Sequence, residues 1–302
     1  MSTDRRILCV GLCVIDFVHI CDKYPAEDSD KRSLGGHWQR GGNASNNCTV
    51  LRNLGADCEF LGVVSNSSAF RFLRDDFNKH GIAIKNCPLV DQDPIFSSII
   101  LSQATKSRTI ICTNQNFPIL RYDDFKKVKL DEYKWIHFEA RNPQETGRMI
   151  EDIMRFNLRA ERPIRTSLEL EKPREGDLVL TKYMDYVFFG KDFANYFGWN
   201  DIKSAIYGLK DRIENKNCSL ICTWGCNGSA IMWPSGEVAF INPYPPDTIV
   251  DSLGAGDTFC ASVIFALNSG KTLYQAVDFG SKVAGFKLSF YGYDKVRDFN
   301  AF

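Results

Sequence analysis

The sequence predicts an α/β protein with a doubly wound, mostly parallel sheet that carries helices on both faces. Short runs of residues that are apolar throughout alternate along the chain with longer segments whose apolar residues recur at helical spacing. Strands without polar alternation are typical of a parallel sheet buried between two helix layers. The 302 residues, 44% of them apolar, contain neither an internal repeat nor a low-complexity linker. We therefore expect a single domain over residues 1–302.

Strands and helices are expected to alternate for most of the chain. We expect strands at 7–15, 58–65, 134–139, 164–170, 185–190 and 219–224. We expect helices at 44–54, 69–80, 144–158, 201–214, 256–268 and 272–287. Two segments interrupt the alternation: residues 17–40 are long, polar and charged, and residues 95–114 have the pattern of a β-hairpin. We expect these two insertions to meet as a small, discontinuous β-sheet lid over the main sheet.

Composition excludes several classes of function. Lysine plus arginine equals aspartate plus glutamate at 37 each, which argues against a nucleic-acid partner. No apolar stretch reaches the length of a membrane span. The eleven cysteines are odd in number and lie mostly in apolar runs, a pattern that favours reduced thiols in a cytoplasmic protein. The Cys9/Cys13, Cys218/Cys222 and Cys222/Cys226 spacings come near a zinc pattern, but the first two pairs fall within expected strands.

The stretch "DSLGAGDTF", residues 251–259, places small residues at the start of an expected helix. The unpaired N–H groups of a helix N-terminus attract anions, and Gly254, Ala255 and Gly256 let an anion approach the backbone closely. Asp257 then lies beside the anion, where it can accept a proton from an attacking hydroxyl. Its ordinary pKa of about 3.9 would leave it ionised at neutral pH. The stretch alone leaves a second interpretation open, in which Asp257 merely complements the helix dipole.

The stretch "RGGNASNN", residues 40–47, precedes another expected helix. Gly41 and Gly42 predict a close-approach turn, and Asn43 is a suitable N-cap. Asn43 and Asn46 lie on neighbouring positions of the first turn, where two amides can bind hydroxyl groups. A cap beside a solvated asparagine explains the same pattern.

Three further features belong to the candidate site. Asp16 is expected at the carboxyl end of the first strand, where open parallel sheets bind ligands, although it could simply begin the next loop. The turn "TWGCNG", residues 223–228, is open enough for a flat ring or a phosphate. Arg108 in the hairpin can reach back to a polyphosphate, although most arginines on hairpins are solvated. The chain lacks the lysine-ending phosphate loop and the G-x-G-x-x-G dinucleotide pattern, which disfavours both of those classes.

Taken together and in this order, these segments resemble the ribokinase-like family of carbohydrate kinases. "RGGNASN" and "DSLGAGDTF" look like the two signatures of that family. "DKYPAEDSDKR", "KWIHFEARN" and "ELEKPRE" look specifically like its animal members that phosphorylate fructose. The resemblance implies a ribokinase-like fold and ATP-dependent phosphorylation of fructose at its C1 hydroxyl to give fructose 1-phosphate. It also implies magnesium with the ATP, a potassium ion near Asp251, and a homodimer in which the β lids pair as a clasp.

The resemblance assigns roles by position. It implies that Asp257 is the base and that Gly254, Ala255 and Gly256 form the anion hole. It implies that the sugar is bound by Asp16, Gly42, Asn43, Asn46 and Asp257. It implies that ATP is bound by Arg108, by Gly225, Cys226, Asn227 and Gly228, and by Gly254, Ala255 and Gly256.

Four departures leave alternatives open. Ser107 stands where the fructose-phosphorylating members have an asparagine that contacts the sugar, and Cys226 replaces an acidic residue of the nucleotide loop. The wider family's Asn-x-x-Glu is absent, with Lys191 and Ala194 at its ends. The tail, residues 293–302, is longer than usual and either covers or leaves the site. The alternatives are a kinase for another ketose, a pentose or a nucleoside, and a catalytically silent sugar or nucleotide sensor. The intact Asp257 and glycines argue against the silent protein.

Overall fold

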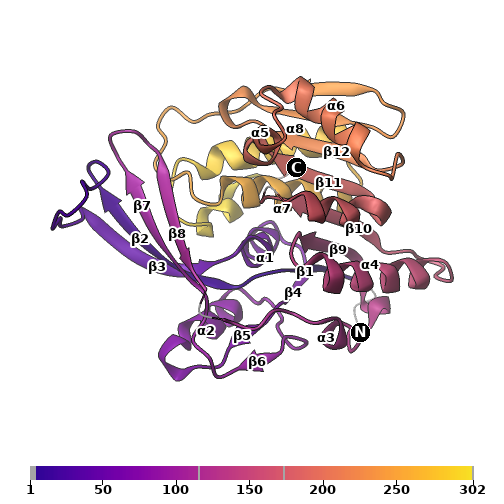
Figure 1. Ribbon diagram of the computed structural model, residues 1–302, viewed down its shortest axis with the longest axis horizontal. Helices are drawn as coiled ribbons and strands as arrows, with labels where there is room; N and C mark the ends of the chain where they lie inside the picture. The colour runs from indigo at the N-terminus through magenta and orange to yellow at the C-terminus, as the bar shows by residue number, and fades with distance from the viewer. Residues whose placement is uncertain (1–4, 115, 173, 301–302) are drawn as a thin grey trace.

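A computed structural model describes residues 5–114, 116–172 and 174–300. An eight-stranded sheet, with helices packed against it, forms the body, and a four-stranded sheet projects from one side (Figure 1). The main sheet contains β1 (Arg6–Val10), β4 (Cys58–Leu61), β9 (Tyr133–Glu139), β10 (Arg165–Leu170), β11 (Tyr186–Gly190), β12 (Ser219–Thr223), β13 (Ser229–Met232) and β14 (Val238–Ile241). The α-helices are α1 (Asn43–Asn53), α2 (Phe72–Lys79), α3 (Tyr122–Phe125), α4 (Pro143–Asn157), α5 (Lys191–Tyr196), α6 (Ile202–Arg212), α7 (Ala255–Asn268) and α8 (Leu273–Lys287).

The main sheet is mostly parallel, as expected. Its strand order is β14-β13-β12-β11-β10-β9-β1-β4. All pairs from β4 through β12 are parallel, and the β12–β13 and β13–β14 pairs are antiparallel. The carboxyl ends of β9, β10, β11 and β12 therefore lie along one edge of the sheet, where a ligand site is expected.

Helices cover both faces of this sheet, which explains why its strands are apolar throughout. Along β1, Ile7 and Cys9 belong to the core that includes buried residues of α1, α7 and α8. Leu8 and Val10 belong to the opposite core, with buried residues of α4 and α6. Both faces of the strand are thus buried, the pattern of a doubly wound fold.

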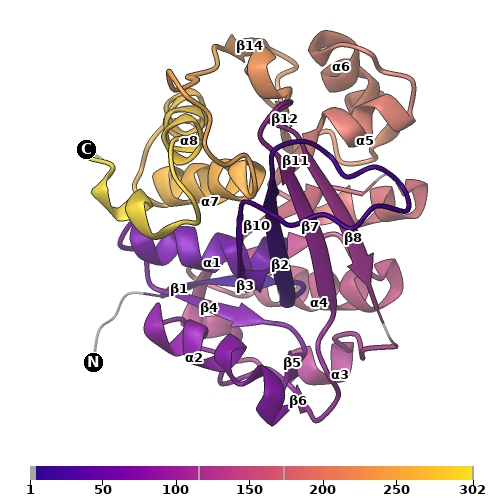
Figure 2. The same cartoon turned by 90° about the vertical axis from the view of Figure 1, so that its left-hand side faces the viewer.

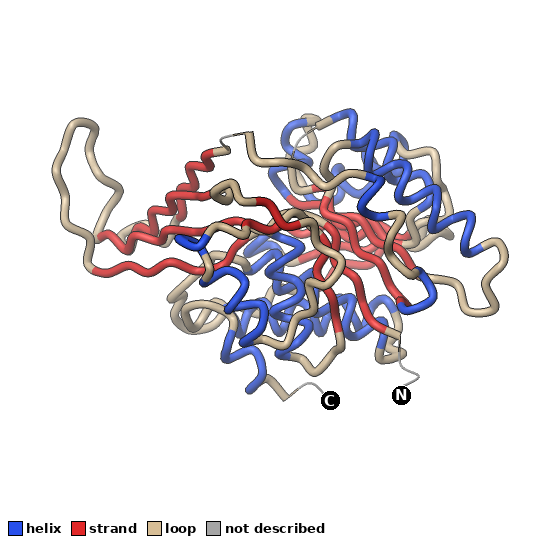
Figure 3. The backbone as a smooth tube through the Cα atoms, turned by 90° about the horizontal axis from the view of Figure 1, so that it is seen from below, coloured by secondary structure: helices blue, strands red, loops and turns tan. Residues whose placement is uncertain are grey.

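The second sheet contains β2 (Val14–Cys21), β3 (Gly35–Gly41), β7 (Phe96–Ser102) and β8 (Arg108–Thr113), in the order β3-β2-β7-β8. The two insertions expected to meet, about 17–40 and 95–114, do supply these strands. Figure 2 shows the sheet facing the viewer in front of the body, and Figure 3 shows its strands reaching beyond the helices. A third, two-stranded sheet pairs β5 (Val64–Ser65) with β6 (Leu89–Val90).

The first apolar run forms two strands, so the single strand expected at 7–15 was wrong. β1 ends at Val10, and β2 begins at Val14 in the other sheet. The chain is packed closely between them, because a Cβ on Gly11 would lie 2.4 Å from Glu139 Oε2 and 2.7 Å from Ala44 Cβ. The Leu12 N–H then donates to Glu139 Oε2 over 2.9 Å. A side chain that is distant in sequence sets this bend, and no local pattern could reveal it.

The expected helices match closely in position. Asp201 and Thr272 form capping boxes at the starts of α6 and α8, with Ser204 and Gln275 as the third helical residues. The region expected as one helix at 69–80 contains a 3₁₀ turn, Ser68–Phe70, followed by α2. Within the described residues, no helix is both long and apolar enough to cross a membrane.

Candidate active site

The glycine pattern opens helix α7, as predicted. Gly254 is the N-cap with a φ of 72°, a left-handed conformation that glycine adopts without strain. The helical ladder begins with the Thr258 N–H, which donates to the Gly254 carbonyl over 2.9 Å. The N–H groups of Ala255, Gly256 and Asp257 therefore have no partner inside the helix. A Cβ on Gly256 would meet no atom within 4 Å, so this face of the first turn borders open space and suits an anion.

Asp257 lies in the first turn of α7 and is held by α1. Asn46 Nδ2 donates to Asp257 Oδ2 over 2.7 Å, and Asn47 Nδ2 donates to the Asp257 carbonyl over 2.9 Å. Burial raises the pKa of Asp257 to about 7; the Asn46 bond opposes this change, and the charges of Glu171 and Glu139 add to it. The ordinary pKa expected from the sequence was therefore wrong, because burial penalises the charged form. A carboxylate that ionises near neutral pH can accept a proton from a hydroxyl.

The start of α1 differs from the expected cap. The N-cap is Gly42, with a φ of 97°, and Asn43 is already the first helical residue. A Cβ on Gly42 would lie 2.2 Å from the Leu12 carbonyl oxygen, so this position requires glycine. Asn43 Nδ2 donates to Glu169 Oε2 over 3.3 Å. Asn46 Oδ1 is buried without a hydrogen-bond partner among the residues described, so it can accept a bond from a ligand hydroxyl.

Three acidic residues that the sequence analysis did not identify as site residues lie near Asp257. Glu139 ends β9, Glu169 lies in β10, and Glu171 follows β10. Arg141 donates to Glu139 Oε1 over 2.6 Å and lies 3.6 Å from Glu171 Oε2. Burial and the charge of Asp257 raise the pKa of Glu169 well above its usual range. Their position at the carboxyl ends of adjacent parallel strands was the signal that could have identified them.

Asp16 belongs to the second sheet, so its expected place at the end of the first strand was wrong. It is the third residue of β2 and is 6% exposed. Burial raises its pKa to about 6, although hydrogen bonds with Gln39 and Ser97 oppose the change. Its carboxylate lies over the glycine pair, since a Cβ on Gly41 would be 2.1 Å from Asp16 Oδ2. Asp16 thus borders the turn that leads into α1.

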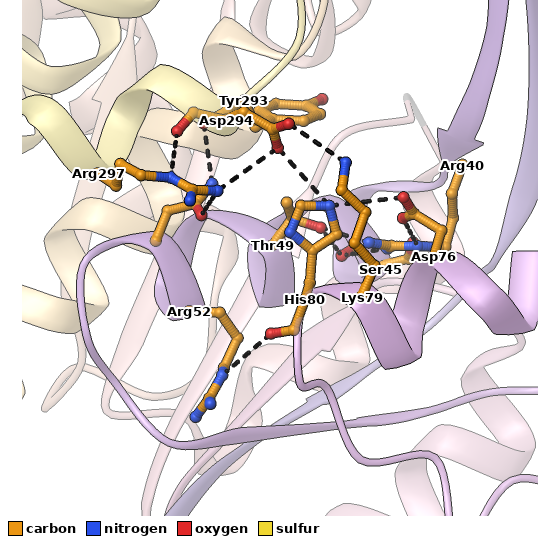
Figure 4. A network of polar contacts seen from close by, with 11 residues as sticks. Arg40, Ser45, Thr49, Arg52, Asp76, Lys79, His80, Tyr293, Asp294 and Arg297 are labelled. Carbon is orange, nitrogen blue, oxygen red and sulfur yellow. Dashed lines mark hydrogen bonds and ion pairs between the residues drawn. The ribbon is translucent and has the colours of Figure 1, made fainter.

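The residue before the glycine pair, Arg40, is buried and fully engaged (Figure 4). Its guanidinium donates to Asp76 Oδ2 over 2.8 Å, to the Ser45 carbonyl over 2.8 Å and to Thr49 Oγ1 over 2.5 Å. The guanidinium also stacks 4.2 Å from the centre of the Phe77 ring. These contacts connect β3, α1 and α2, and they fix the backbone where the glycine pair begins.

The C-terminal segment joins the same network and stays on the body as far as it is described. Asp294 lies 3.7 Å from His80 and 3.3 Å from Lys79, and His80 lies 3.5 Å from Asp76 (Figure 4). The 3₁₀ helix Asp294–Asp298 packs against α1 and α8. The tail was expected either to cover the site or to leave it. Residues 293–300 do not leave the body, and residues 301–302 lie outside the described part.

The hairpin of the second sheet reaches the turn before α7. Arg108, the first residue of β8, donates to the Ser252 carbonyl over 3.5 Å. Ser107 is exposed and its hydroxyl pairs with Thr105 over 2.7 Å. A cavity of about 170 Å³ lies between the hairpin tip and residues 248–252, with Ser107 and Tyr291 among its lining. The two insertions are thus placed beside the start of α7.

The expected nucleotide turn follows β12 as the 3₁₀ turn Gly225–Asn227. Gly225 and Gly228 have φ values of 59° and 84°, which explains both glycines. Cys226 and Asn227 are exposed, and the Cys226 Sγ lies 3.7 Å from Asn227 Oδ1. The turn lies at the same sheet edge as the ends of β9 and β10, because β9 through β12 are parallel.

The carboxylate of Asp251 is a poor site for the expected potassium ion. Its Oδ2 lies 2.6 Å from Lys287 Nζ and 3.3 Å from the Gly292 nitrogen, and its Oδ1 accepts from the Leu253 N–H over 2.9 Å. The buried ammonium of Lys287 already balances the charge of Asp251. A potassium ion would have to use other oxygens.

The cysteines form no disulfide framework, and the His-containing cluster lies in the core. All eleven are free, and only Cys112 and Cys226 are exposed. In the described ranges, the group with a metal-like arrangement is His137, Glu169 and Cys260. Burial lowers the pKa of His137 to about 3, and its Nδ1 lies 2.8 Å from Ser167 Oγ. The ring is therefore a neutral, hydrogen-bonded core residue.

Comparison with known proteins identifies the family that this fold and site define. Residues 4–295 match the pfkB family carbohydrate kinases, and the chain belongs to that family. It is accordingly a phosphotransferase with an alcohol group as acceptor, and a sugar kinase. The chain is 42% identical to the ketohexokinase of Mus musculus over 97% of its length and 99% of that protein. It is 21% identical to the ribokinase of Bacillus subtilis over 95% of the chain and 94% of that protein.

Solved structures confirm the ribokinase-like fold. The ribokinase of Giardia lamblia superposes with a TM-score of 0.82 at 17% identity, covering 99% of both chains. The ribokinase of Arabidopsis thaliana, solved with ribose and ATP, gives a TM-score of 0.77 at 16% identity, covering 97% of this chain and 96% of that one. At these identities the likeness concerns the fold alone.

Proposed function

We propose that this sugar kinase transfers the γ-phosphoryl group of ATP to the C1 hydroxyl of fructose, giving fructose 1-phosphate and ADP. The observation that carries the proposal is Asp257: a buried carboxylate with a pKa raised to about 7, beside helix N–H groups that lack intrahelical partners. The 42% identity to a ketohexokinase over nearly the whole chain supports fructose as the sugar.

Asp257 acts as the base. The incoming hydroxyl donates to Asp257 while Asn46 holds the carboxylate in place through its bond to Oδ2. As the oxygen attacks the phosphoryl group, the N–H groups of Ala255, Gly256 and Asp257 receive the equatorial oxygens. These N–H groups form the anion hole at the start of α7, where the small residues Gly254, Ala255 and Gly256 let the phosphoryl group approach the backbone.

Polar groups from the second sheet and from helix α1 bind the sugar. Asp16 from β2 and Asn43 and Asn46 from α1 lie around Gly42. Gly42 has a left-handed backbone and no side chain, so it leaves room beside them. Buried carboxylates and amides discriminate sharply between a sugar that has the hydroxyl they bind and a sugar that lacks it. The exposed Ser107 at the hairpin tip completes this side and replaces the longer asparagine of related kinases.

Nucleotide binding involves Arg108 and the turn Gly225–Gly228. Arg108 already bonds the loop before α7, so its charge lies near the transferring group. Cys226 and Asn227 are exposed at the sheet edge, where an adenine ring can lie against the open glycine backbone. Magnesium prefers oxygen ligands and phosphate, and it would neutralise charge on the phosphates. Glu171 is partly exposed and close enough to influence the pKa of Asp257, so it fits a role in which it would hold magnesium through a water molecule. Lys191 and Ala194 do not fit that role.

The second sheet acts as a lid and as the contact of a homodimer. β8 is an edge strand, and its Ile110 and Ile111 side chains are 48% and 55% exposed. Trp38 on the opposite edge strand, β3, is 65% exposed. Apolar edge strands of this kind pair with another chain. A cytoplasmic location remains a prediction from the free cysteines.

A panel of sugars tests the substrate. Fructose, other ketoses, ribose and a nucleoside are each supplied with ATP, magnesium and potassium, and ADP release is measured with the Asp257→Asn variant as the matched control. Fructose should give the highest kcat/KM. Turnover of ribose or the nucleoside without any ketose turnover would reject fructose, and sugar binding without ADP release would support the silent alternative.

A further inference from the structure

Lys287 is a fully buried lysine that the catalytic proposal does not use. It is the last residue of α8, its side chain is 0% exposed, and its Nζ lies 2.6 Å from Asp251 Oδ2 and 3.1 Å from the Asp251 carbonyl oxygen. Burial lowers the pKa of Lys287, and the charge of Asp251 raises it again. A buried lysine is costly to ionise unless it is paired, so the pair with Asp251 is required for this placement.

The Lys287–Asp251 pair lies directly behind the turn that opens α7. The Asp251 and Val250 N–H groups both donate to the Leu288 carbonyl, over 3.2 and 2.8 Å. The Gly292 N–H donates to Asp251 Oδ2 over 3.3 Å. The segment that follows α8, which we call the buttress (residues 287–293), therefore holds residues 250–251 from three backbone or side-chain positions.

The buttress also contacts the N-cap of α7. A Cβ on Gly254 would lie 1.9 Å from Tyr293 Oη, so the tyrosine ring end packs against the Gly254 backbone. Tyr293 in turn is anchored to α1, because Asn53 Nδ2 donates to its carbonyl over 2.9 Å. The left-handed turn at Gly254 thus lies between the buttress and the open face that would receive a phosphoryl group.

The charges of Asp257 and Arg108 also affect the pKa of Lys287. The charge of Asp257 raises the pKa of Lys287 and that of Arg108 lowers it, after the larger effects of burial and of Asp251. A positive charge in a water-excluded position interacts more strongly than one in solvent.

We propose that Lys287 is a positioning residue for phosphoryl transfer, whose ammonium fixes Asp251 and, through it, the turn that presents the helix N–H groups to the phosphoryl group. The proposal rests on the function proposed above. Lys287 touches neither sugar nor nucleotide; it acts through the backbone from Asp251 to Gly254. Removing its charge should therefore slow the transfer step and weaken phosphate binding while leaving the sugar residues in place.

Stability and catalysis are separated by removing both charges. Lys287→Met alone leaves Asp251 buried and unpaired, so its unfolding midpoint should fall by about 10 °C. The double variant Lys287→Met with Asp251→Asn removes both charges of the pair, so neither is left buried without a partner, and its midpoint should return to within about 3 °C of the wild type. Its kcat should still be about 10- to 100-fold lower, with the KM for the sugar within about threefold of the wild-type value.

The matched control is Lys282→Met on the same helix, which removes an exposed pair with Asp278 and should leave kcat and the midpoint unchanged. A double variant with wild-type kcat would reduce the pair to a structural role and overturn the proposal. Should the double variant fail to fold, Lys287→Gln removes the charge while its amide still donates to Asp251, and an unchanged kcat there overturns the proposal equally.

A second readout keeps this test separate from the substrate. The rise in unfolding midpoint caused by ADP with magnesium is measured for the wild type, the double variant and Lys282→Met. The double variant should lose at least half of that rise. If the wild type phosphorylates none of the sugars, the proposed function fails. The role of Lys287 is tested separately, because it is rejected if ADP with magnesium raises the unfolding midpoint of the double variant as much as that of the wild type.

Discussion

The raised pKa of Asp257 predicts an unusual pH dependence of catalysis. With a pKa of about 7, the ionised fraction of Asp257 is about nine-tenths at pH 8, about one-tenth at pH 6 and about one-hundredth at pH 5. Because the base must be ionised to accept a proton, kcat/KM should fall about tenfold from pH 8 to pH 6 and about 100-fold to pH 5. An aspartate at its ordinary pKa would lose less than about a tenth of its activity over the same range. Asp16, with a pKa of about 6, should steepen the fall below pH 6.

The assay is kcat/KM for fructose at saturating ATP, magnesium and potassium from pH 5 to pH 9, with circular dichroism at each pH to confirm folding. Glu171→Gln removes a charge that raises the pKa of Asp257, so the acid limb should move to lower pH. Glu237→Gln, an exposed acid in the β13–β14 turn, is the matched control and should not move it. A flat profile from pH 5 to pH 8 would refute the assignment of Asp257 as a base with a raised pKa.

Four further predictions follow from the same contacts. Asp257→Asn should lower turnover about 10²- to 10⁴-fold with smaller changes in sugar and ATP affinity, and near-normal turnover in steady-state kinetics would reject the role of Asp257 as the base. The same variant should raise the unfolding midpoint, and more at pH 8 than at pH 5. The reason is that the unfavourable buried charge of Asp257 develops as pH rises from its unfolded pKa through about 7. Gly256→Val should fold normally, since its Cβ meets open space, and should block phosphate approach while calorimetry shows intact sugar binding; full activity would contradict this. Arg40→Met should lower the free energy of unfolding in urea by about 3 kcal/mol, because it removes a buried cation that donates to Asp76, Ser45 and Thr49 and leaves Asp76 with His80 alone; a loss under about 1 kcal/mol would show that the network in Figure 4 is not stabilising. Ile111→Lys should yield monomers by light scattering if the exposed β8 edge forms the dimer contact, whereas a monomeric, fully active wild type would exclude the clasp.

The main sheet and most helices could be predicted from local patterns. Continuous apolar runs located β9 to β12, and apolar residues at helical spacing located α6 and α8, whose capping boxes at Asp201 and Thr272 agree with the expected starts. The first apolar run was misassigned, because its break at Gly11 depends on Glu139, 128 positions away in the chain. The hairpin pattern at 95–114 did not reveal that its first strand, β7, is an inner strand of the second sheet, where Ile99 is 1% exposed. Strand order is a tertiary property that a single hairpin pattern does not contain.

The identity of the site residues was easier to predict than their environment. Asp257, Asn46 and the helix N-terminus at Gly254 come together as the motifs indicated. The raised pKa values of Asp257 and Asp16 could not be predicted, because they result from burial beside other elements. Lys287 gave no signal either: a lysine at the end of an amphipathic helix is usually solvated, and only the fold places it beside Asp251.

We propose that this chain phosphorylates fructose at C1 with Asp257 as the base. The most direct measurement is NMR of the product formed from ¹³C-labelled fructose with ATP, magnesium and potassium, with ADP quantified in the same sample. We expect one equivalent of fructose 1-phosphate, seen as phosphorus coupling to C1, for each ADP, and none with Asp257→Asn. Phosphorus coupling to C6, or ADP release without any phosphorylated fructose, would contradict it.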